Sequence, residues 1–514
     1  MLGLELVIAL GAVLLAGHLS AARLRVSAPV ILVFLGVVLG LIPQLRGVSL
    51  PPEVMLLLFL PVLLYWESSN TSLREIRSNL RVITLMSTLL VAATAALVAT
   101  VAHALGLAWG PAWVLGAAVA PTDATAVGAF ARSLPRREVT VLKAESLVND
   151  GAALVIYAIA VGTTMGSGRP GVARTGWLLL LAYGGGLLAG LLVGRIAVEA
   201  RRRVTDPLLG NVVILLIPFT AYLLAEVTGA SGVIAVVVTG LLMSQYGPRV
   251  GRAATRVQTI AFWSLATFLL NGALFALIGL EVHKAVRDLG GIPLDQGALL
   301  VLAIAVTVVG ARFLWLFTTP YALRVLDRRP RQRLRRVGAR TRVLSGIAGF
   351  RGAVSLAAAL AVPADFPDRG LIIFTVCGVI VTTLVVQALI FPRVTRWANL
   401  PPDTAFQDEL RLAEETAARN ALAALPALAK QVGAEQSVVE QVSHELHAEV
   451  AGRTSETAKF EDGYRALRLA TLAGKRVTLV ALRDTNRIDD LILKQIQSRL
   501  DREELRLARQ PESE

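Results

Sequence analysis

The sequence predicts an all-α polytopic membrane protein of about 13 transmembrane helices followed by a helical tail. Hydrophobic residues make up 55% of the 514 residues and charged residues only 17%. The mean hydropathy of +0.63 is too high for a soluble protein of ordinary composition. Apolar runs continue to residue 396, after which the composition changes to mixed charge. We therefore expect a membrane domain, residues 1–400, and a cytoplasmic tail, residues 401–514.

The apolar runs predict the spans one by one. No basic residue precedes the first run and no clear cleavage site occurs before Arg23, so we expect a retained helix and not a signal peptide. The predicted spans are 2–19, 28–43, 53–67, 80–105, 110–132, 138–165, 174–199, 207–227, 231–245, 257–280, 296–325, 342–362 and 370–396.

Arginine and lysine residues separate onto alternate loops. The loops of one side carry about 22 of them and the loops of the other side about 6, which places the first set in the cytoplasm. We therefore predict an N-terminus outside the cell, a cytoplasmic C-terminus and insertion in the cell (inner or plasma) membrane. Adding or losing one span in the middle would scramble this separation, which supports the predicted number of spans.

The tail has the pattern of cytoplasmic helices. In DDLILKQIQSRLDREELRLA, apolar residues recur at helical spacing with charged residues between them. Two interpretations remain open for this segment. It is either a helix for self-association or regulation, or an appendage that only keeps the chain soluble.

Composition also excludes several classes of protein. The net charge of +14 raises the question of nucleic-acid binding, but the basic residues lie in short loops with almost no aromatic residues between them, which argues against that partner. The single cysteine, Cys377, lies in an apolar run and excludes an intrachain disulfide and a cysteine metal cluster. Because no histidine-rich metal cluster or serine–histidine pair stands out, we expect neither an enzyme nor a cofactor.

Two carboxylates lie deep within predicted spans. Asp123 and Asp150 are each about 13 residues into an apolar run, which at ~1.5 Å per residue is close to mid-bilayer. A charge there is costly unless it is paired, faces water or is neutralised by a proton or a metal ion. Both aspartates are therefore candidates for function.

Polar residues line one side of the span that contains Asp150. The helical period places Ser146 and Asp150 one above the other, and Glu145 and Asn149 on the adjacent stripe. Hydroxyl, carboxylate and backbone carbonyl groups are hard oxygen ligands that suit a small alkali cation. A transition metal would favour histidine or cysteine, which this stretch lacks. The stretch is therefore a candidate cation site.

Two spans contain residues that interrupt a helix. Pro121 removes a backbone hydrogen bond in one span, and Gly349 and Gly352 flank Arg351 in another. Irregular backbone at this depth is tolerated only where it is buried in protein or lines a cavity. Interrupted helices in the two halves of a chain favour a midplane site built from inverted repeats, and the alternative is that the glycines only permit close packing.

Buried acids require positive partners. Arg312 and Arg351 are the two arginines deepest in the later apolar runs, and we expect one of them to pair with Glu145. A structural ion pair is the favoured interpretation of Glu145. Glu67 lies near the end of a predicted span; the favoured interpretation is an interfacial residue, and a functional role is the lesser alternative.

These motifs resemble those of a known family. PTDATAV followed by ESLVND, with GARF and GFRGAVSL further on, is similar to the monovalent cation:proton antiporter-1 family, which includes bacterial sodium/proton antiporters and eukaryotic sodium/proton exchangers. The resemblance covers about residues 1–397, and ESLVND with an upstream TD is the specific part of it.

The resemblance implies a 13-helix fold with inverted repeats. The runs 110–132 and 342–362 would be the interrupted helices, and they would cross. A core bundle would move against a dimerisation bundle in an elevator-type alternating access, and the protein would be a homodimer. The core bundle would comprise about 80–165 and 296–396, and the dimerisation bundle about 1–67 and 174–280.

For function, the resemblance implies exchange of a monovalent cation for H⁺, with Na⁺ as the main cation and Li⁺ as another. Asp150 would carry the cation or the proton, assisted by Asp123. Thr122, Asp123 and Ser146 would supply further cation ligands through side chain or backbone. The implied physiology is pH homeostasis and salt tolerance.

The resemblance also assigns structural roles. Glu145 would pair with Arg312, and Arg351 would lie at the second helix break. Asn149, a neutral residue in place of a second carboxylate, implies one-for-one, electroneutral exchange. Many members have proline directly after the first aspartate, whereas this chain has Ala124, so the form of the first break is an open point.

Other functions remain open on the sequence. K⁺/H⁺ exchange would use the same mechanism, because the choice of cation depends on cavity size and ligand flexibility. A cation channel or a membrane sensor is disfavoured, since carboxylates on interrupted helices are typical of a carrier.

Overall fold

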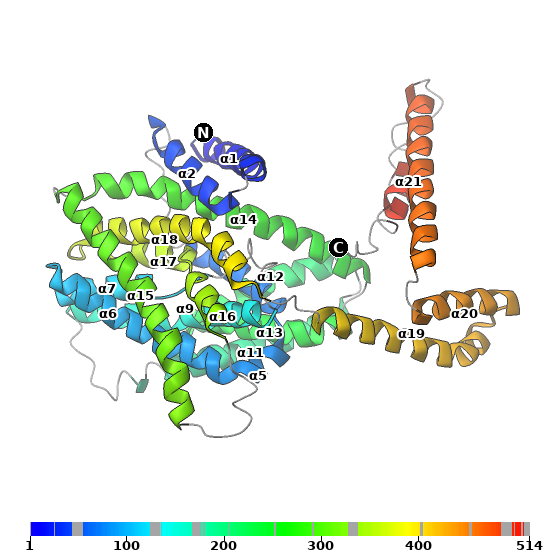
Figure 1. Ribbon diagram of the computed structural model, residues 1–514, viewed down its shortest axis with the longest axis horizontal. Helices are drawn as coiled ribbons and strands as arrows, with labels where there is room; N and C mark the ends of the chain where they lie inside the picture. Colours follow the sequence, from blue (N-terminus) through cyan, green and yellow to red (C-terminus); the bar gives the residue numbers. More distant parts are fainter. Residues whose placement is uncertain are drawn as a thin grey trace. The chain divides into compact units, whose positions relative to one another are not determined.

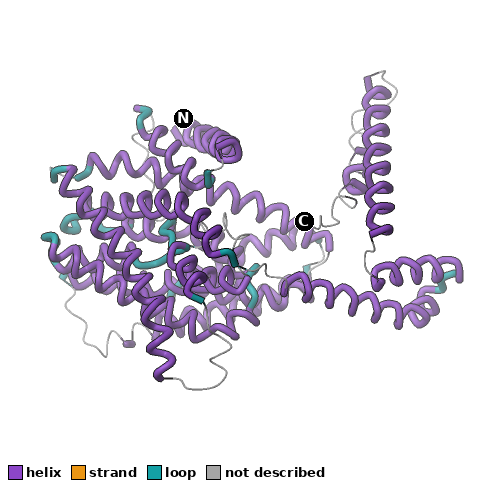
Figure 2. The backbone as a smooth tube through the Cα atoms, viewed as in Figure 1, coloured by secondary structure: helices purple, strands orange, loops and turns teal. Residues whose placement is uncertain are grey.

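The described part of the chain consists of helices joined by loops and turns (Figure 2). The computed structural model describes residues 2–24, 26–43, 55–123, 134, 136–166, 176–177, 180–204, 206–250, 253–289, 292–326, 338–400, 405–451, 455–484, 496–497, 499–504 and 507. No strand occurs within these ranges. The chain divides into two compact units, Met1–Pro402 and Asp403–Glu514. The all-helical class predicted from the apolar runs is confirmed.

The first unit contains the apolar helices (Figure 1). Three short π-helical turns, η2, η3 and η5, lead directly into α4, α6 and α11. In order, the elements are α1 (Leu2–Leu24), α2 (Ala28–Gly40), η2 (Met55–Phe59), α4 (Leu60–Ser69), α5 (Leu73–Thr84), η3 (Leu85–Leu90), α6 (Val91–Ala104), α7 (Trp109–Val119), α9 (Arg136–Thr164), η5 (Leu181–Gly185), α11 (Gly186–Arg203), α12 (Pro207–Val227), α13 (Gly232–Val250), α14 (Ala253–Arg287), α15 (Leu294–Leu326), α16 (Ala339–Ile347), α17 (Ala353–Leu360) and α18 (Arg369–Ala398).

Eight helical stretches among the described residues are long and apolar enough to cross a membrane. Each coincides with a predicted run, and four shorter apolar helices lie in four further runs. The eight stretches are Leu4–Leu24, Leu85–Ala104, Glu138–Thr164, Leu181–Arg203, Pro207–Val227, Thr255–Arg287, Leu294–Tyr321 and Arg369–Ala398.

The two runs predicted to be interrupted do not form continuous helices. In the run 342–362, α16 ends at Ile347 and α17 begins at Ala353, with irregular backbone between them. In the run 110–132, α7 ends at Val119 and the backbone is irregular as far as Asp123. Pro121 has no N–H with which to continue the helical ladder. Residues 124–133 of this run, including Ala124, lie outside the described residues.

Helices α2 and α14 pack backbone against backbone. A methyl group on Gly36 would lie 2.0 Å from the carbonyl oxygen of Ala276, and one on Gly279 would lie 2.1 Å from that of Val33. Only glycine fits at such distances, so these two positions hold the helices in close, fixed contact.

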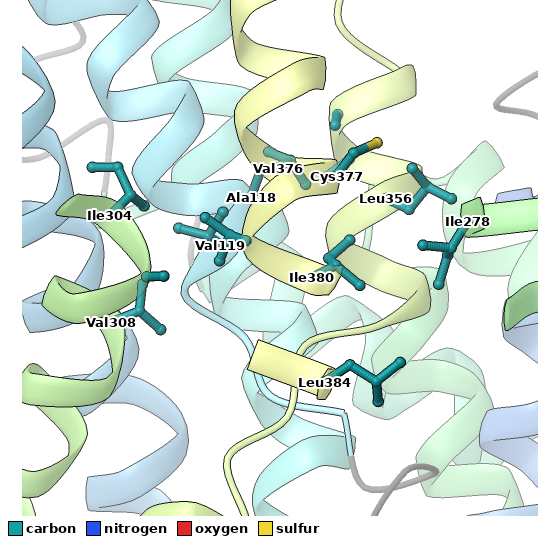
Figure 3. Packing of buried hydrophobic residues seen from close by; sticks show 14 of the residues in the cluster. Ala118, Val119, Ile278, Ile304, Val308, Leu356, Val376, Cys377, Ile380 and Leu384 are labelled. Carbon is teal, nitrogen blue, oxygen red and sulfur yellow. The ribbon is translucent and has the colours of Figure 1, made fainter. Parts of the chain in front are cut away.

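Another side of α14 contacts α18 and α17 through apolar side chains (Figure 3). Ile278 of α14, Leu356 of α17 and Cys377 of α18 are all fully buried and belong to one hydrophobic cluster. The same cluster includes residues of α7 and α15. Figure 3 labels Ala118 and Val119 of α7 and Ile304 and Val308 of α15.

The described residues of the second unit form three long helices with short helical pieces after them. They are α19 (Ala405–Val432), α20 (Gln436–Ala451) and α21 (Ser455–Asp484). Gly433, with φ 70°, ends α19 in the left-handed conformation that favours glycine. Of the predicted amphipathic segment 489–508, only 496–497, 499–504 and 507 are described, and they are helical.

Candidate cation site at the helix breaks

The two irregular segments are joined by backbone and side-chain hydrogen bonds. The Asp123 N–H donates to the Phe350 carbonyl oxygen (2.8 Å), and the Ala353 N–H donates to Asp123 Oδ2 (3.2 Å). The Asp123 carboxylate thus satisfies an unpaired N–H at the start of α17, where negative charge is favourable. A methyl group on Gly352 would lie 1.8 Å from Asp123 Oδ2, so this position requires glycine.

Arg351 supplies positive charge and hydrogen-bond donors at the end of α7. Its Nε donates to the Val119 carbonyl oxygen (2.9 Å), and its Nη1 donates to the Gly349 carbonyl oxygen. The guanidinium is 2% exposed. Positive charge is favourable at a helix C-terminus, where carbonyl groups lack partners. Each break therefore supplies the charge that the helix end of the other break needs.

Glu145 and Arg312 form a buried ion pair between α9 and α15. Arg312 Nη2 donates to Glu145 Oε2 (3.0 Å) and Nη1 donates to Glu145 Oε1, so the contact is bidentate. Both side chains are 2% exposed. Arg312 Nε also donates to the Ser345 carbonyl oxygen (3.0 Å), which attaches the pair to α16. Of the two arginines considered as partners, the structure brings Arg312 to Glu145.

Thr122 connects this ion pair to Asn149. Its hydroxyl donates to Glu145 Oε1 (3.3 Å) and accepts a hydrogen bond from Asn149 Nδ2 (2.8 Å). Asn149 is 1% exposed and Thr122 8% exposed. The first break is therefore fastened to the Glu145–Asn149 stripe of α9.

The neighbouring stripe of α9 faces a cavity between α4, the first break and α17. Ser146 and Asp150 line this cavity together with Asp123. Asp150 is 4% exposed and Ser146 5% exposed. The full lining is Leu60, Leu63, Leu64, Glu67, Pro121, Thr122, Asp123, Ser146, Asp150, Gly352, Ala353, Val354 and Ser355.

The structure brings most of the predicted residues to one place. Pro121 and Gly352 line the cavity, whereas Gly349 and Arg351 lie at the second break and are absent from the lining. Glu145, Asn149 and Arg312 are close by but are absent from the lining.

Two polar residues of the cavity lining were not among the site residues predicted from the sequence. Glu67 lies in the cavity wall, so its interpretation as an interfacial residue misses this position. Glu67 lies near the end of an apolar run, which favoured the interfacial interpretation. Its position at the cavity results from the packing of α4, which the sequence alone does not show. Ser355 of α17 also lines the cavity, and its position four residues after Arg351 in the interrupted span was the available signal.

The described residues that line the cavity offer oxygen atoms and no soft ligands. Carboxylates of Asp150, Asp123 and Glu67 and hydroxyls of Ser146, Thr122 and Ser355 are the polar side-chain groups of its lining. Such groups bind hard cations, and the carboxylates also accept protons. A carboxylate enclosed in this way is stable when a cation or a proton neutralises it.

Residues 8–397 match the family described as "Sodium/hydrogen exchanger, transmembrane". The chain belongs to the sodium/hydrogen exchanger family. Members of this family are transporters and not enzymes, and the chain is accordingly a multi-pass membrane protein. The resemblance read from PTDATAV and ESLVND is confirmed.

Relatives and solved structures agree with this membership of the sodium/hydrogen exchanger family. An uncharacterised Na⁺/H⁺ exchanger of Mycobacterium tuberculosis is 43% identical, over 98% of this chain and 96% of its own. The low-affinity Na⁺/H⁺ antiporter NhaS1 of Synechocystis is 29% identical, over 76% and 75%. The sodium/proton antiporter NhaP1 of Methanocaldococcus jannaschii, at 18% identity, has a similar fold, with a TM-score of 0.58 over 77% of this chain and 99% of that one.

Proposed function

We propose that this exchanger moves a monovalent cation, Na⁺ in the first place and Li⁺ also, across the membrane in exchange for H⁺. The observation that carries the proposal is the position of Asp150, a carboxylate that is 4% exposed and faces a cavity between two interrupted helices. The names of the relatives, Na⁺/H⁺ exchangers and antiporters, support the same pair of ions.

Competition at Asp150 couples the two fluxes. Burial makes the bare carboxylate unfavourable, so Asp150 takes up a cation or a proton, and each excludes the other. The loaded or the protonated site crosses the membrane, whereas the empty charged site does not. This alone produces antiport.

Ser146, Asp123 and Thr122 complete the cation's coordination. Ser146 offers its hydroxyl, and Asp123 offers the carboxylate whose Oδ2 also accepts from the start of α17. The Thr122 hydroxyl is engaged with Glu145 and Asn149, and the Thr122 carbonyl oxygen also accepts a hydrogen bond from Asn149 Nδ2 (3.4 Å). Because a carbonyl oxygen has two lone pairs, we assign this carbonyl to the cation. Glu67 adds a carboxylate on the opposite wall, from α4.

Asn149 makes the exchange electroneutral. A second carboxylate at this position would add a proton to each cycle, whereas the amide is neutral and is held by Thr122. Glu145 with Arg312 and Arg351 with the end of α7 then serve as structural contacts that keep the breaks in place.

Alternating access is of the elevator type in this proposal. Polar contacts join α7, α9, α15, α16 and α17 into one core. This core meets α14 largely through apolar side chains, a kind of contact that permits sliding (Figure 3). The core would comprise about 80–165 and 296–396, and about 1–67 and 174–280 would form a dimerisation bundle in a homodimer.

The remaining architecture follows the predicted topology. We propose that the protein lies in the cell (inner or plasma) membrane and has 13 spans with inverted repeats. Its N-terminus would lie outside the cell, and its tail, from about residue 401, in the cytoplasm. The loop charges support this orientation.

Cation-dependent collapse of a pH gradient in proteoliposomes tests the proposal. Na⁺, Li⁺ and K⁺ are compared with and without a clamped membrane potential. A response to Na⁺ and Li⁺ that does not depend on the membrane potential supports electroneutral Na⁺/H⁺ exchange. A preference for K⁺ would retain the mechanism with another cation, and no proton-coupled response to any of the three would overturn it.

A further inference from the structure

The Tyr183 hydroxyl is a buried donor without a partner among the described residues. Tyr183 lies in η5, the π-helical turn that leads into α11. Its hydroxyl oxygen is buried and makes no hydrogen bond to any described residue. Burial of a hydroxyl without a partner is unfavourable, and most buried polar groups have one. Short π-helical turns are frequent at functional sites.

This hydroxyl lies against α9, next to Asp150. A methyl group on Gly151 would come within 3.9 Å of the Tyr183 hydroxyl oxygen, and Gly151 directly follows Asp150. Tyr183 also packs against the small hydrophobic cluster that contains Ala152 and Ala153 of α9. It is not among the described residues that line the cavity. The Tyr183 hydroxyl therefore lies at the side of α9 that is next to the cavity side.

The backbone of η5 is attached to α13. The Ser231 N–H, at the start of α13, donates to the Ala182 carbonyl oxygen (3.1 Å). A methyl group on Gly186 would lie 2.8 Å from the Ser231 carbonyl oxygen, so α11 also approaches α13 closely. In the proposed elevator, η5, α11 and α13 belong to the dimerisation bundle, whereas α9 belongs to the core. Tyr183 is thus a side chain of one bundle that lies against a helix of the other.

Asp150 is the polar side chain of α9 that lies nearest to the position of Gly151. Residues 152–156 are all apolar. A step of one residue turns the helix by about 100°, so Asp150 lies about 100° from Gly151 and Asn149 about 200° from it. A carboxylate accepts a hydrogen bond from a hydroxyl, and such a bond is stronger than one between neutral groups. A shift of the core along the dimerisation bundle would therefore give the Tyr183 hydroxyl a strong acceptor.

We propose that the Tyr183 hydroxyl donates to the Asp150 carboxylate in the second position of the core, and so positions this carboxylate after the shift. The inference rests on the elevator mechanism of the proposed function. In the position that the structure shows, the hydroxyl has no partner among the described residues. An interaction that forms in only one of two states favours that state. Tyr183 is therefore a positioning residue that sets the balance between the two positions of the core.

Exchange by Tyr183→Phe in proteoliposomes tests this role. The variant loses the hydroxyl and keeps the ring that packs against α9. We expect the maximal rate of Na⁺/H⁺ exchange to fall about fivefold to tenfold, as for the loss of one hydrogen bond, with a KM for Na⁺ within about threefold of the wild type. The midpoint of thermal unfolding should be unchanged or higher, because phenylalanine buries no unpartnered hydroxyl.

Tyr222→Phe is the matched control. It makes the same chemical change within the dimerisation bundle, where the Tyr222 ring of α12 lies against Gly232 of α13. These contacts stay the same when the core moves. The maximal rate of exchange of Tyr222→Phe should therefore equal that of the wild type.

Three results would overturn the role of Tyr183 and leave the proposed exchange intact. The first is an unchanged maximal rate in Tyr183→Phe, as expected if the hydroxyl contacts only water. The second is an equal fall in Tyr183→Phe and Tyr222→Phe. The third is a lower unfolding midpoint of Tyr183→Phe, which would make the hydroxyl structural. Absence of Na⁺/H⁺ exchange in the wild type would instead overturn the proposed function, and the role of Tyr183 with it.

Discussion

Two adjacent stripes of α9 have opposite surroundings. Glu145 and Asn149 bind protein groups, with Arg312 and Thr122 as their partners. Ser146 and Asp150, each one residue further along, line the cavity. A step of one residue turns a helix by about 100°, which is enough to change what a side chain faces.

This difference explains how one helix holds a rigid frame and an exchangeable ion. The first stripe fastens α9 to the first break and to α15, and through Arg312 to α16. In our proposal, the oxygen atoms of the second stripe bind the cation and the proton. Variants on the two stripes should therefore differ in kind: stability should change on one, and exchange on the other.

The largest effect on exchange is expected from Asp150→Asn. The amide is neutral and isosteric, so the variant should fold but lose the group for which cation and proton compete. We expect exchange in proteoliposomes to fall to background, roughly a 100-fold loss or more. Size-exclusion profile and thermal unfolding should match the wild type. Retained exchange in this variant would remove Asp150 from the mechanism.

Arg312→Gln is expected to have the largest effect on stability. It leaves the buried Glu145 carboxylate without its positive partner, which costs about 3–5 kcal/mol in the free energy of unfolding. Denaturant unfolding in detergent measures this. Arg203→Gln, which removes an exposed ion pair, is the control and should cost about 0–1 kcal/mol. Similar losses in the two variants would show that the Glu145–Arg312 pair is not structural.

Glu67→Gln should weaken cation binding without abolishing exchange. Glu67 is a carboxylate on the cavity wall that α4 provides. In our proposal it assists Asp150 without replacing it. We expect the KM for Na⁺ to rise about tenfold with a nearly unchanged maximal rate. Glu226→Gln is the matched control, because that side chain accepts a hydrogen bond from the Gly232 N–H (3.2 Å) and is absent from the cavity lining. An unchanged KM for Na⁺ in Glu67→Gln would exclude Glu67 from the cation site.

Thr122→Val should have the smallest effect. It keeps the shape of the side chain but removes the hydroxyl that joins Asn149 to Glu145, at a cost of about 1 kcal/mol in stability. Exchange should stay within about threefold of the wild type, because the cation uses the backbone carbonyl in our proposal. A loss as large as that of Asp150→Asn would instead make the Thr122 hydroxyl a cation ligand.

The helical class could be predicted well from the sequence because span length and hydropathy are local properties. The eight long apolar helices fall on predicted runs for this reason. Where a span stops was harder to place. The sequence indicates an interruption at Pro121, but the end of α7 at Val119 also depends on Arg351, which comes from a distant part of the chain.

The candidate site divides in the same way. The positions of Ser146 and Asp150 on one stripe follow from helical periodicity alone. From their depth in apolar runs, Arg312 and Arg351 were both candidate partners of Glu145. Only the packing of α15 brings Arg312 to it. Glu67 was missed because no local pattern shows which helix forms the opposite wall of a cavity.

Proton release on Na⁺ binding tests competition at Asp150 most directly. Na⁺ is titrated into the purified protein in weakly buffered solution that contains a pH indicator, and the protons released per bound Na⁺ are counted at several pH values. We predict about one proton per Na⁺ where the site is protonated, and an apparent Na⁺ affinity that falls as the pH falls, by up to about tenfold per pH unit. Asp150→Asn should release none. Na⁺ binding by the wild type without proton release at any pH would contradict competition.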